Sequence, residues 1–168
     1  MAPTGIPMRQ ALSPDTYRPG LKVKNIYLKK MKDGDKKMEL RTWGPSKYTP
    51  RGCPAAKVGA RLFLLESGAG KLWGSAKIAD VIVIGDAASF RDHYEEHRFN
   101  LDEGTELAAH LRRTLEDGGV LYGWRLDEFR WASRRLVSGE KPVPNWVRRG
   151  SRSAWAGVPL SAALEEFF

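Results

Sequence analysis

The segment GDKKMELRTW, residues 34–43, places charged side chains at short intervals between apolar ones. Lys36 and Arg41 are cations suited to phosphate, and an arginine can contact phosphate through two parallel hydrogen bonds. Glu39 lies between them and would repel phosphate. A binding role therefore requires that Glu39 accept a hydrogen bond from the exocyclic amine of a base, or hold Arg41 in place. The plainer interpretation is an ion-paired strand surface, in which an exposed pair contributes less than about 1 kcal/mol.

Aromatic residues accompany this charged segment. Trp43, Tyr48 and Tyr27 are candidate surfaces for base stacking, and each stacked base contributes roughly 1–3 kcal/mol to binding. Three other tryptophans occupy apolar strand patterns and are predicted to lie in the core: Trp73, Trp124 and Trp131. The basic segment VRRGSR near the C-terminus either extends the binding face or is a soluble hairpin loop.

Hydrophobic periodicity predicts the elements that position the charged segment. Alternation over residues 36–43 predicts a strand with Glu39 and Arg41 on one face. Before it, a short strand beginning at Leu21 runs into a short helix that stops at Asp33 and Gly34. After it, prolines and glycines over residues 44–60 predict a long loop.

The remaining elements alternate between strands and helices. Strands are predicted over residues 60–67 and 70–84, and the second is expected to bend at Gly74. Helices are predicted over residues 86–99 and 102–119, followed by a turning strand over 121–137. At 168 residues, one domain is expected. Its predicted divisions are a proline-rich leader (1–20), the domain itself (21–158, with a helical insertion at about 86–118) and a short C-terminal helix (159–168).

Charge is distributed unevenly along the chain. The net charge is +8, but residues 1–61 hold 14 Lys and Arg against 4 Asp and Glu, whereas residues 62–128 hold 7 against 13. Residues 129–168 are basic again, with 7 against 3. If the two basic segments meet in space, the molecule has one basic face, as expected of a protein that binds a polyanion.

Composition excludes several other classes of protein. No apolar run approaches the roughly 20 residues that span a bilayer, and the N-terminal segment lacks the apolar core of a secretory signal. We therefore expect a cytoplasmic protein with no membrane partner. Cys53 is the single cysteine, so neither an internal disulfide nor a cysteine-rich zinc site is expected.

Two segments resemble catalytic motifs without satisfying them. ESGAGKL lacks the first glycine and the final hydroxyl residue of a phosphate-binding loop, so a hairpin turn is predicted instead. HYEEH places His93, Glu96 and His97 in the order found in inverted zinc peptidases. That site needs a third ligand and a large catalytic chamber, so we expect an exposed helix face and no metal.

The charged segment resembles a family signature. Gly34, Lys36, Glu39 and Arg41 match the G-x-K-x-x-E-x-R pattern of the ASCH (activating signal cointegrator homology) domain, within the PUA-like superfamily. The flanking segments LKVKNIYLKKMKDG, YTPRG, LWGSAKIADVIVI and YGWRLDEFRWASRRLV are also similar to that family, so the resemblance covers roughly residues 21–157. Lys24 falls where members often carry a basic or polar residue.

The resemblance implies an α+β fold, a small mixed or antiparallel β-barrel with flanking helices, and a cleft linked to RNA. We therefore expect a nucleic-acid-binding module, with RNA favoured over DNA and no cofactor. The ligand would be single-stranded RNA or a modified nucleotide. The expected contacts are Lys24, Lys36, Glu39, Arg41, Trp43, Tyr48 and Arg51.

An enzymatic alternative stays open at this point. Some relatives resemble amidohydrolases acting on N4-acetylcytidine, and others look like ribonucleases. Lys36 and Glu39 would then be the catalytic residues. The amidohydrolases pair their lysine with a threonine where this chain has Glu39, and a nearby carboxylate favours the unreactive ammonium form.

Overall fold

Six strands form one mixed sheet in the order β2-β5-β4-β3-β1-β6. The computed structural model describes residues 17–44, 57–69, 71–137 and 155–159, together with Leu164 and Phe167. β1 and β3 are parallel, and every other neighbouring pair is antiparallel. In chain order the strands are β1 (Tyr17–Val23), β2 (Met38–Arg41), β3 (Arg61–Glu66), β4 (Lys71–Ile84), β5 (Leu121–Val137) and β6 (Trp155–Pro159).

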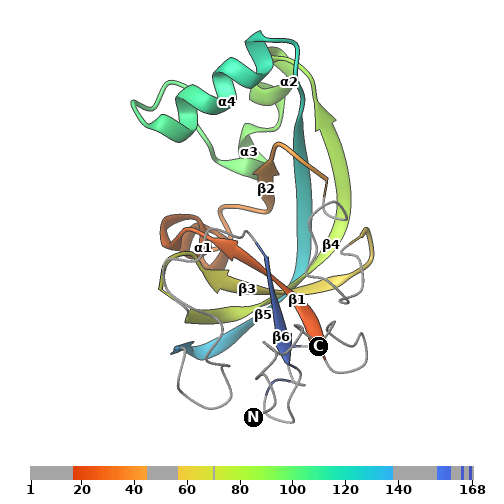
Figure 1. Ribbon diagram of the computed structural model, residues 1–168, viewed down its shortest axis with the longest axis vertical. Coiled ribbons are helices and arrows are strands. Elements are labelled where there is room, and N and C mark those ends of the chain that lie inside the picture. The colour runs from red at the N-terminus through yellow and green to blue at the C-terminus, as the bar shows by residue number, and fades with distance from the viewer. Residues whose placement is uncertain are drawn as a thin grey trace, which may run out of the picture.

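The sheet is open, so the predicted small β-barrel is wrong, although the α+β class is confirmed. Within the described residues, β2 pairs with β5 alone and β6 pairs with β1 alone, which leaves both as edge strands. β2 is four residues long and pairs with the first part of β5, from Tyr122 to Arg125. In Figure 1, β4 and β5 run as a long ribbon away from the other strands, with β2 beside its far half.

α1 (Asn25–Lys32) connects β1 to β2, as predicted. Leu28 and Met31 are its buried residues. The helix stops at Asp33, and Gly34 follows with φ +84°, a conformation that other residues adopt at a cost. The glycine of the signature therefore turns the chain out of α1 and toward β2.

Three helices fill the predicted insertion between β4 and β5. They are α2 (Ala87–Asp92), α3 (Tyr94–His97) and α4 (Glu106–Glu116). Asp86 caps α2 by accepting a hydrogen bond from the Ser89 N–H, and Thr105 caps α4 by accepting one from Ala108. In Figure 1 they gather at the far end of the β4–β5 ribbon. None of the helices in the described part of the chain is long and apolar enough to span a membrane.

The ends of the chain differ in part from expectation. β1 begins at Tyr17, so its first four residues come from the segment predicted as leader. Of the predicted C-terminal helix, the described residues are Pro159, which ends β6, and Leu164 and Phe167. Cys53 and the basic segment VRRGSR lie outside the described residues.

The core contains the tryptophans predicted for it. Trp73 and Trp124 are buried in the cluster that also contains the apolar residues of α1, and Trp131 packs against that cluster while partly exposed. A second cluster joins the insertion to the sheet through Met38 of β2 and Leu111 of α4. Both elements are therefore held by shared apolar contacts.

Gly74 marks the predicted bend in β4. The pairing with β5 shifts register between Leu72 and Gly74, which is the irregularity of a β-bulge. A Cβ atom at Gly74 would overlap the carbonyl oxygen of Arg130 in β5. The absent side chain therefore permits the close approach of the two strands.

We predict that Gly74→Ala lowers the free energy of unfolding by about 1–3 kcal/mol or more, because the added methyl forces β4 and β5 apart. Urea denaturation measures the change. Gly85→Ala is the matched control, since a Cβ atom at Gly85 has no heavy atom within 4 Å. Equal stability of the two variants would contradict the close-approach explanation.

Candidate functional site

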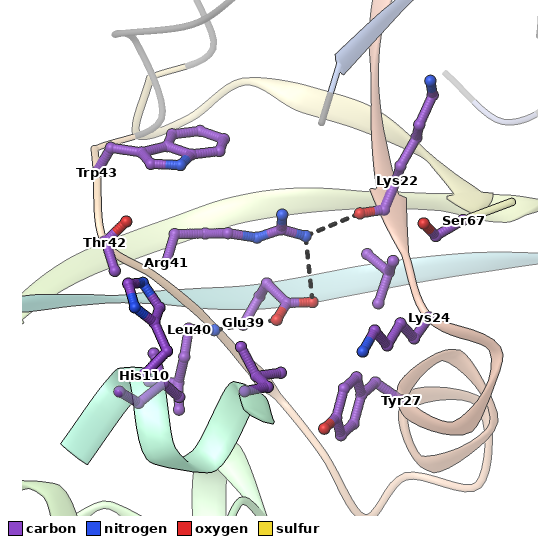
Figure 2. A pocket seen from close by; sticks show the side chains of 13 residues that line it. Lys22, Lys24, Tyr27, Glu39, Leu40, Arg41, Thr42, Trp43, Ser67 and His110 are labelled. Atoms are coloured by element: carbon purple, nitrogen blue, oxygen red, sulfur yellow. Dashed lines mark hydrogen bonds and ion pairs between the residues drawn. The ribbon is translucent and has the colours of Figure 1, made fainter. Parts of the chain in front are cut away.

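A pocket of about 290 Å³ lies where β1 and β2 face one another without pairing. Lys22 and Lys24 line it from β1 and the residue before α1, and Glu39, Arg41 and Trp43 line it from β2 and the residues that follow. In Figure 2 the side chains of Lys24, Glu39, Arg41 and Trp43 lie around the opening, whereas the Lys22 side chain runs away from it and its carbonyl oxygen faces Arg41. The sequence pattern thus brings four of its predicted contacts together: Lys24, Glu39, Arg41 and Trp43.

Arg41 spans the open side of the sheet. Its Nη2 donates a hydrogen bond to the Lys22 carbonyl oxygen at 2.8 Å, which ties β2 to β1 through a side chain (Figure 2). Its Nε is buried and donates no hydrogen bond to the described residues. A guanidinium has five N–H donors, and the Arg41 side chain is 19% exposed, so donors remain for a ligand in the pocket.

Glu39 is almost enclosed beside Arg41. Its Oε1 accepts a hydrogen bond from the Leu40 N–H at 3.1 Å, and its Oε2 lies 3.9 Å from Arg41 Nη2. Oε2 is buried and accepts no hydrogen bond from the described residues. Because both carboxylate oxygens face protein groups, the geometry favours holding Arg41 over reading a base edge.

Lys36 does not line the pocket. It is 2% exposed, and its Nζ donates to the carbonyl oxygens of Met38 at 2.6 Å and His97 at 2.7 Å. The same Nζ lies 5.3 Å from the centre of the Tyr27 ring, within cation–π range. The expected phosphate contact by Lys36 is incompatible with this position, and its role is to join α1, β2 and α3.

Burial lowers the pKa of Lys36 from 10.5 to about 8. The Glu39 carboxylate acts in the opposite direction, because its negative charge favours the ammonium. The Glu39 carboxylate therefore attracts two cations, Lys36 in the interior and Arg41 at the pocket. This arrangement explains why a carboxylate stands in a cation-rich segment.

Two aromatic residues form part of the pocket wall. Trp43 is half-buried, packs edge-on against Trp124 with ring centres 5.3 Å apart, and has the Arg41 guanidinium 5.7 Å from its own ring centre. Tyr27 comes from α1. Burial, followed by the charges of Glu103 and Glu39, raises the pKa of Tyr27 to about 12, so its hydroxyl keeps its proton at neutral pH.

The sequence reasoning missed part of the lining. Lys22 precedes the predicted contact Lys24 by two residues and is 8% exposed, and burial lowers its pKa. Ser67 follows β3, and His110 of α4 lies near Thr42 in Figure 2. A signal for His110 did exist, because it is three residues after Leu107, and residues at this spacing are neighbours on a helix surface.

Two predicted contacts cannot be placed. Tyr48 and Arg51 lie outside the described residues, so their role in the site stays a prediction.

The two apparent catalytic motifs are structural. The residues after β3 form the turn of a β3–β4 hairpin, as predicted for ESGAGKL. The expectation that HYEEH is an exposed helix face is wrong for His97, which is fully buried. His97 Nε2 lies 2.8 Å from the Phe90 carbonyl oxygen, and its Nδ1 accepts from the Phe99 N–H. Both ring nitrogens are therefore occupied.

Glu96 of the same segment is also engaged. Its carboxylate accepts two hydrogen bonds from Arg125 of β5, at 2.7 and 3.0 Å, and these bonds hold the pKa of Glu96 down at about 2. Across the part of the chain that the structure describes, no three His, Cys, Asp or Glu residues gather in a way that could hold a metal ion.

Comparison with known proteins identifies the fold. No family model and no curated protein matches the sequence significantly. Among solved structures, the ASCH protein of Zymomonas mobilis is similar at 14% identity and a TM-score of 0.51, covering 88% of this chain and 90% of that one. The chain has the ASCH fold. The resemblance to ASCH domains inferred from the signature is therefore confirmed at the level of structure.

Structures of two variants of the Zymomonas mobilis protein are similar to this chain to the same degree. A tyrosine-to-phenylalanine variant matches at 15% identity and a TM-score of 0.55, covering 88% of this chain and 93% of that one. A serine-to-alanine variant matches at 15% identity and a TM-score of 0.52, covering 91% and 94%. At 14–15% identity this likeness concerns the fold alone, and a fold by itself does not determine function.

We predict a pH-dependent difference between the wild type and Lys36→Met. In the unfolded chain Lys36 titrates near 10.5, and in the folded protein near 8, so between these values the unfolded state binds more protons at this site. Stability from this group is lowest below pH 8 and rises through that interval. Between pH 8 and 10.5, the free energy of unfolding of the wild type should rise by about 3 kcal/mol relative to that of Lys36→Met.

Urea denaturation of both proteins at several values between pH 7 and 10.5 measures this difference. Methionine has a similar length and no charge, so the comparison subtracts the titration of all other groups. A difference that stays constant with pH would show that the Lys36 ammonium is not desolvated.

Proposed function

We propose that this chain is a nucleic-acid-binding module that takes single-stranded RNA or a modified nucleotide into the pocket between β1 and β2. The observation that carries the proposal is the composition of that pocket. Two cations, Lys24 and Arg41, and two aromatic residues, Tyr27 and Trp43, line one opening with their side chains. Cations for phosphate combined with aromatic surfaces for bases are the two components of single-strand binding sites.

The size of the pocket supports one nucleotide rather than a duplex. At about 290 Å³ it is at the lower end of the range for small-molecule sites, roughly 300–1,000 Å³. A base can enter such a space when it is unstacked, as in single strands and loops. The preference for RNA over DNA rests on the association of ASCH domains with RNA that the signature implies.

The roles of the pocket residues follow from their geometry. Arg41 is the main phosphate contact, because it combines a fixed position with a partly exposed side chain that lines the pocket. Lys24 adds positive charge at the rim, and Glu39 holds the Arg41 guanidinium. Tyr27 and Trp43 provide apolar surface for the base.

No observation favours the hydrolase alternative. Its lysine would have to reach the substrate, and Lys36 lies behind the pocket with its ammonium directed at two carbonyl oxygens. Turnover of N4-acetylcytidine or of short RNA by the wild type would contradict a purely binding role.

A fluorescence titration tests the proposed function. Labelled RNA and DNA oligomers, single- and double-stranded, are titrated with the protein at two salt concentrations. We expect tightest binding to single-stranded RNA, with an affinity that falls as salt rises because phosphate contacts release counterions. Absence of binding to every oligomer at low salt would refute the proposal.

We predict that Arg41→Ala weakens RNA binding by about 1–3 kcal/mol and lowers the salt dependence by about one phosphate contact. Arg41→Lys keeps the charge but loses the paired donors, so its affinity should fall between those of the wild type and Arg41→Ala. The same titration measures both variants, and circular dichroism checks that each is folded.

Arg113→Ala is the matched control for Arg41→Ala. Arg113 is an exposed arginine on α4 and does not line the pocket, so the charge change is the same at a different place. Equal losses of affinity in Arg41→Ala and Arg113→Ala would show that net charge, and not the pocket, determines binding.

A further inference from the structure

We propose that Lys30 and Tyr27 of α1 form a second nucleotide subsite beside the pocket, so that the ligand is an RNA strand of at least two nucleotides and not a free nucleoside. The inference rests on the proposed function, since it concerns the continuation of the same ligand. It adds a residue, Lys30, that the signature does not include.

Tyr27 links the pocket to the surface of α1. Its side chain lines the pocket and is partly exposed. The Nζ of Lys30 lies 6.0 Å from the centre of the Tyr27 ring. Lys30 is a partly buried residue, and its ammonium thus lies beside an aromatic residue that already belongs to the pocket wall.

An exposed apolar side chain extends this surface. Ile26 is 57% exposed, which makes it one of the most exposed large apolar residues in the described chain. It is four positions before Lys30 and therefore lies on the adjoining part of the helix surface. Tyr27, Lys30 and Ile26 together offer a cation and apolar area, which are the groups that a phosphate and a sugar or base contact.

The lysines around α1 form no ion pair with a carboxylate of the described residues, whereas several cations elsewhere do. Arg125 pairs with Glu96 at 2.7 Å, Arg98 with Glu95 at 2.6 Å and Lys77 with Glu128 at 3.4 Å. Over residues 22–37, by contrast, six lysines form no ion pair with described residues: Lys22, Lys24, Lys29, Lys30, Lys32 and Lys37. Such unpaired charge suits an external polyanion.

Helix geometry separates Lys30 from its neighbours. At about 100° per residue, Lys30 is about 60° from Tyr27 around the axis of α1, whereas Lys29 is about 160° and Lys32 about 140° away. Lys29 and Lys32 are exposed and carry the same charge. Both are controls on the same helix that point away from Tyr27, and Lys32 is the stricter one because Lys29 is about 60° from Ile26.

Competition binding tests the subsite. Unlabelled RNA oligomers of one, two, four and eight nucleotides compete with a labelled eight-nucleotide RNA for the wild type and for Lys30→Gln, Lys29→Gln and Lys32→Gln. We expect wild-type affinity to rise between one and two nucleotides. Lys30→Gln should weaken the eight-nucleotide ligand roughly fivefold at 0.1 M salt and lower its salt slope by about 0.7, with the mononucleotide unaffected.

The outcomes distinguish the two proposals. Equal weakening by all three glutamine variants would overturn the subsite, because the whole helix would then act by general charge. A mononucleotide that binds as tightly as the longer oligomers, with no effect of Lys30→Gln, would overturn the subsite and leave the proposed function standing. No RNA binding at any length would refute the proposed function itself.

Discussion

The hydrogen bond from Arg41 to the Lys22 carbonyl oxygen determines the character of the site. A sheet that closed here would join β2 to β1 by a row of backbone hydrogen bonds, and the space between the strands would disappear. In this protein one side chain spans the gap at 2.8 Å, so the strands stay close and unpaired. The pocket exists because the sheet is held together at this point without being closed.

The charged signature divides into three tasks. Lys36 joins elements in the interior through two carbonyl oxygens, Arg41 faces the pocket, and Glu39 lies between their positive charges. Gly34 supplies the turn that brings the chain from α1 into β2. A pattern that resembles a row of ligand contacts is thus largely the means by which a single guanidinium is placed and oriented.

Local features of the sequence predicted the fold well, and long-range contacts were the part they could not supply. Alternation placed Glu39 and Arg41 on one face, and Gly74 marked the bend in β4. The burial of Lys36 depends on the carbonyl of His97, which is 61 residues away in the chain. Likewise, the open sheet depends on where a four-residue β2 meets β5, which periodicity within β2 does not encode.

One wall of the pocket comes from α4, through Leu107, His110 and Leu111, while the opposite wall comes from β1 and β2. α4 belongs to the segment inserted between β4 and β5, where Leu111 is also part of the core cluster that joins the insertion to the sheet, while His110 is exposed. Substitutions at His110 can therefore change the ligand preference during evolution without removing an apolar residue from the core.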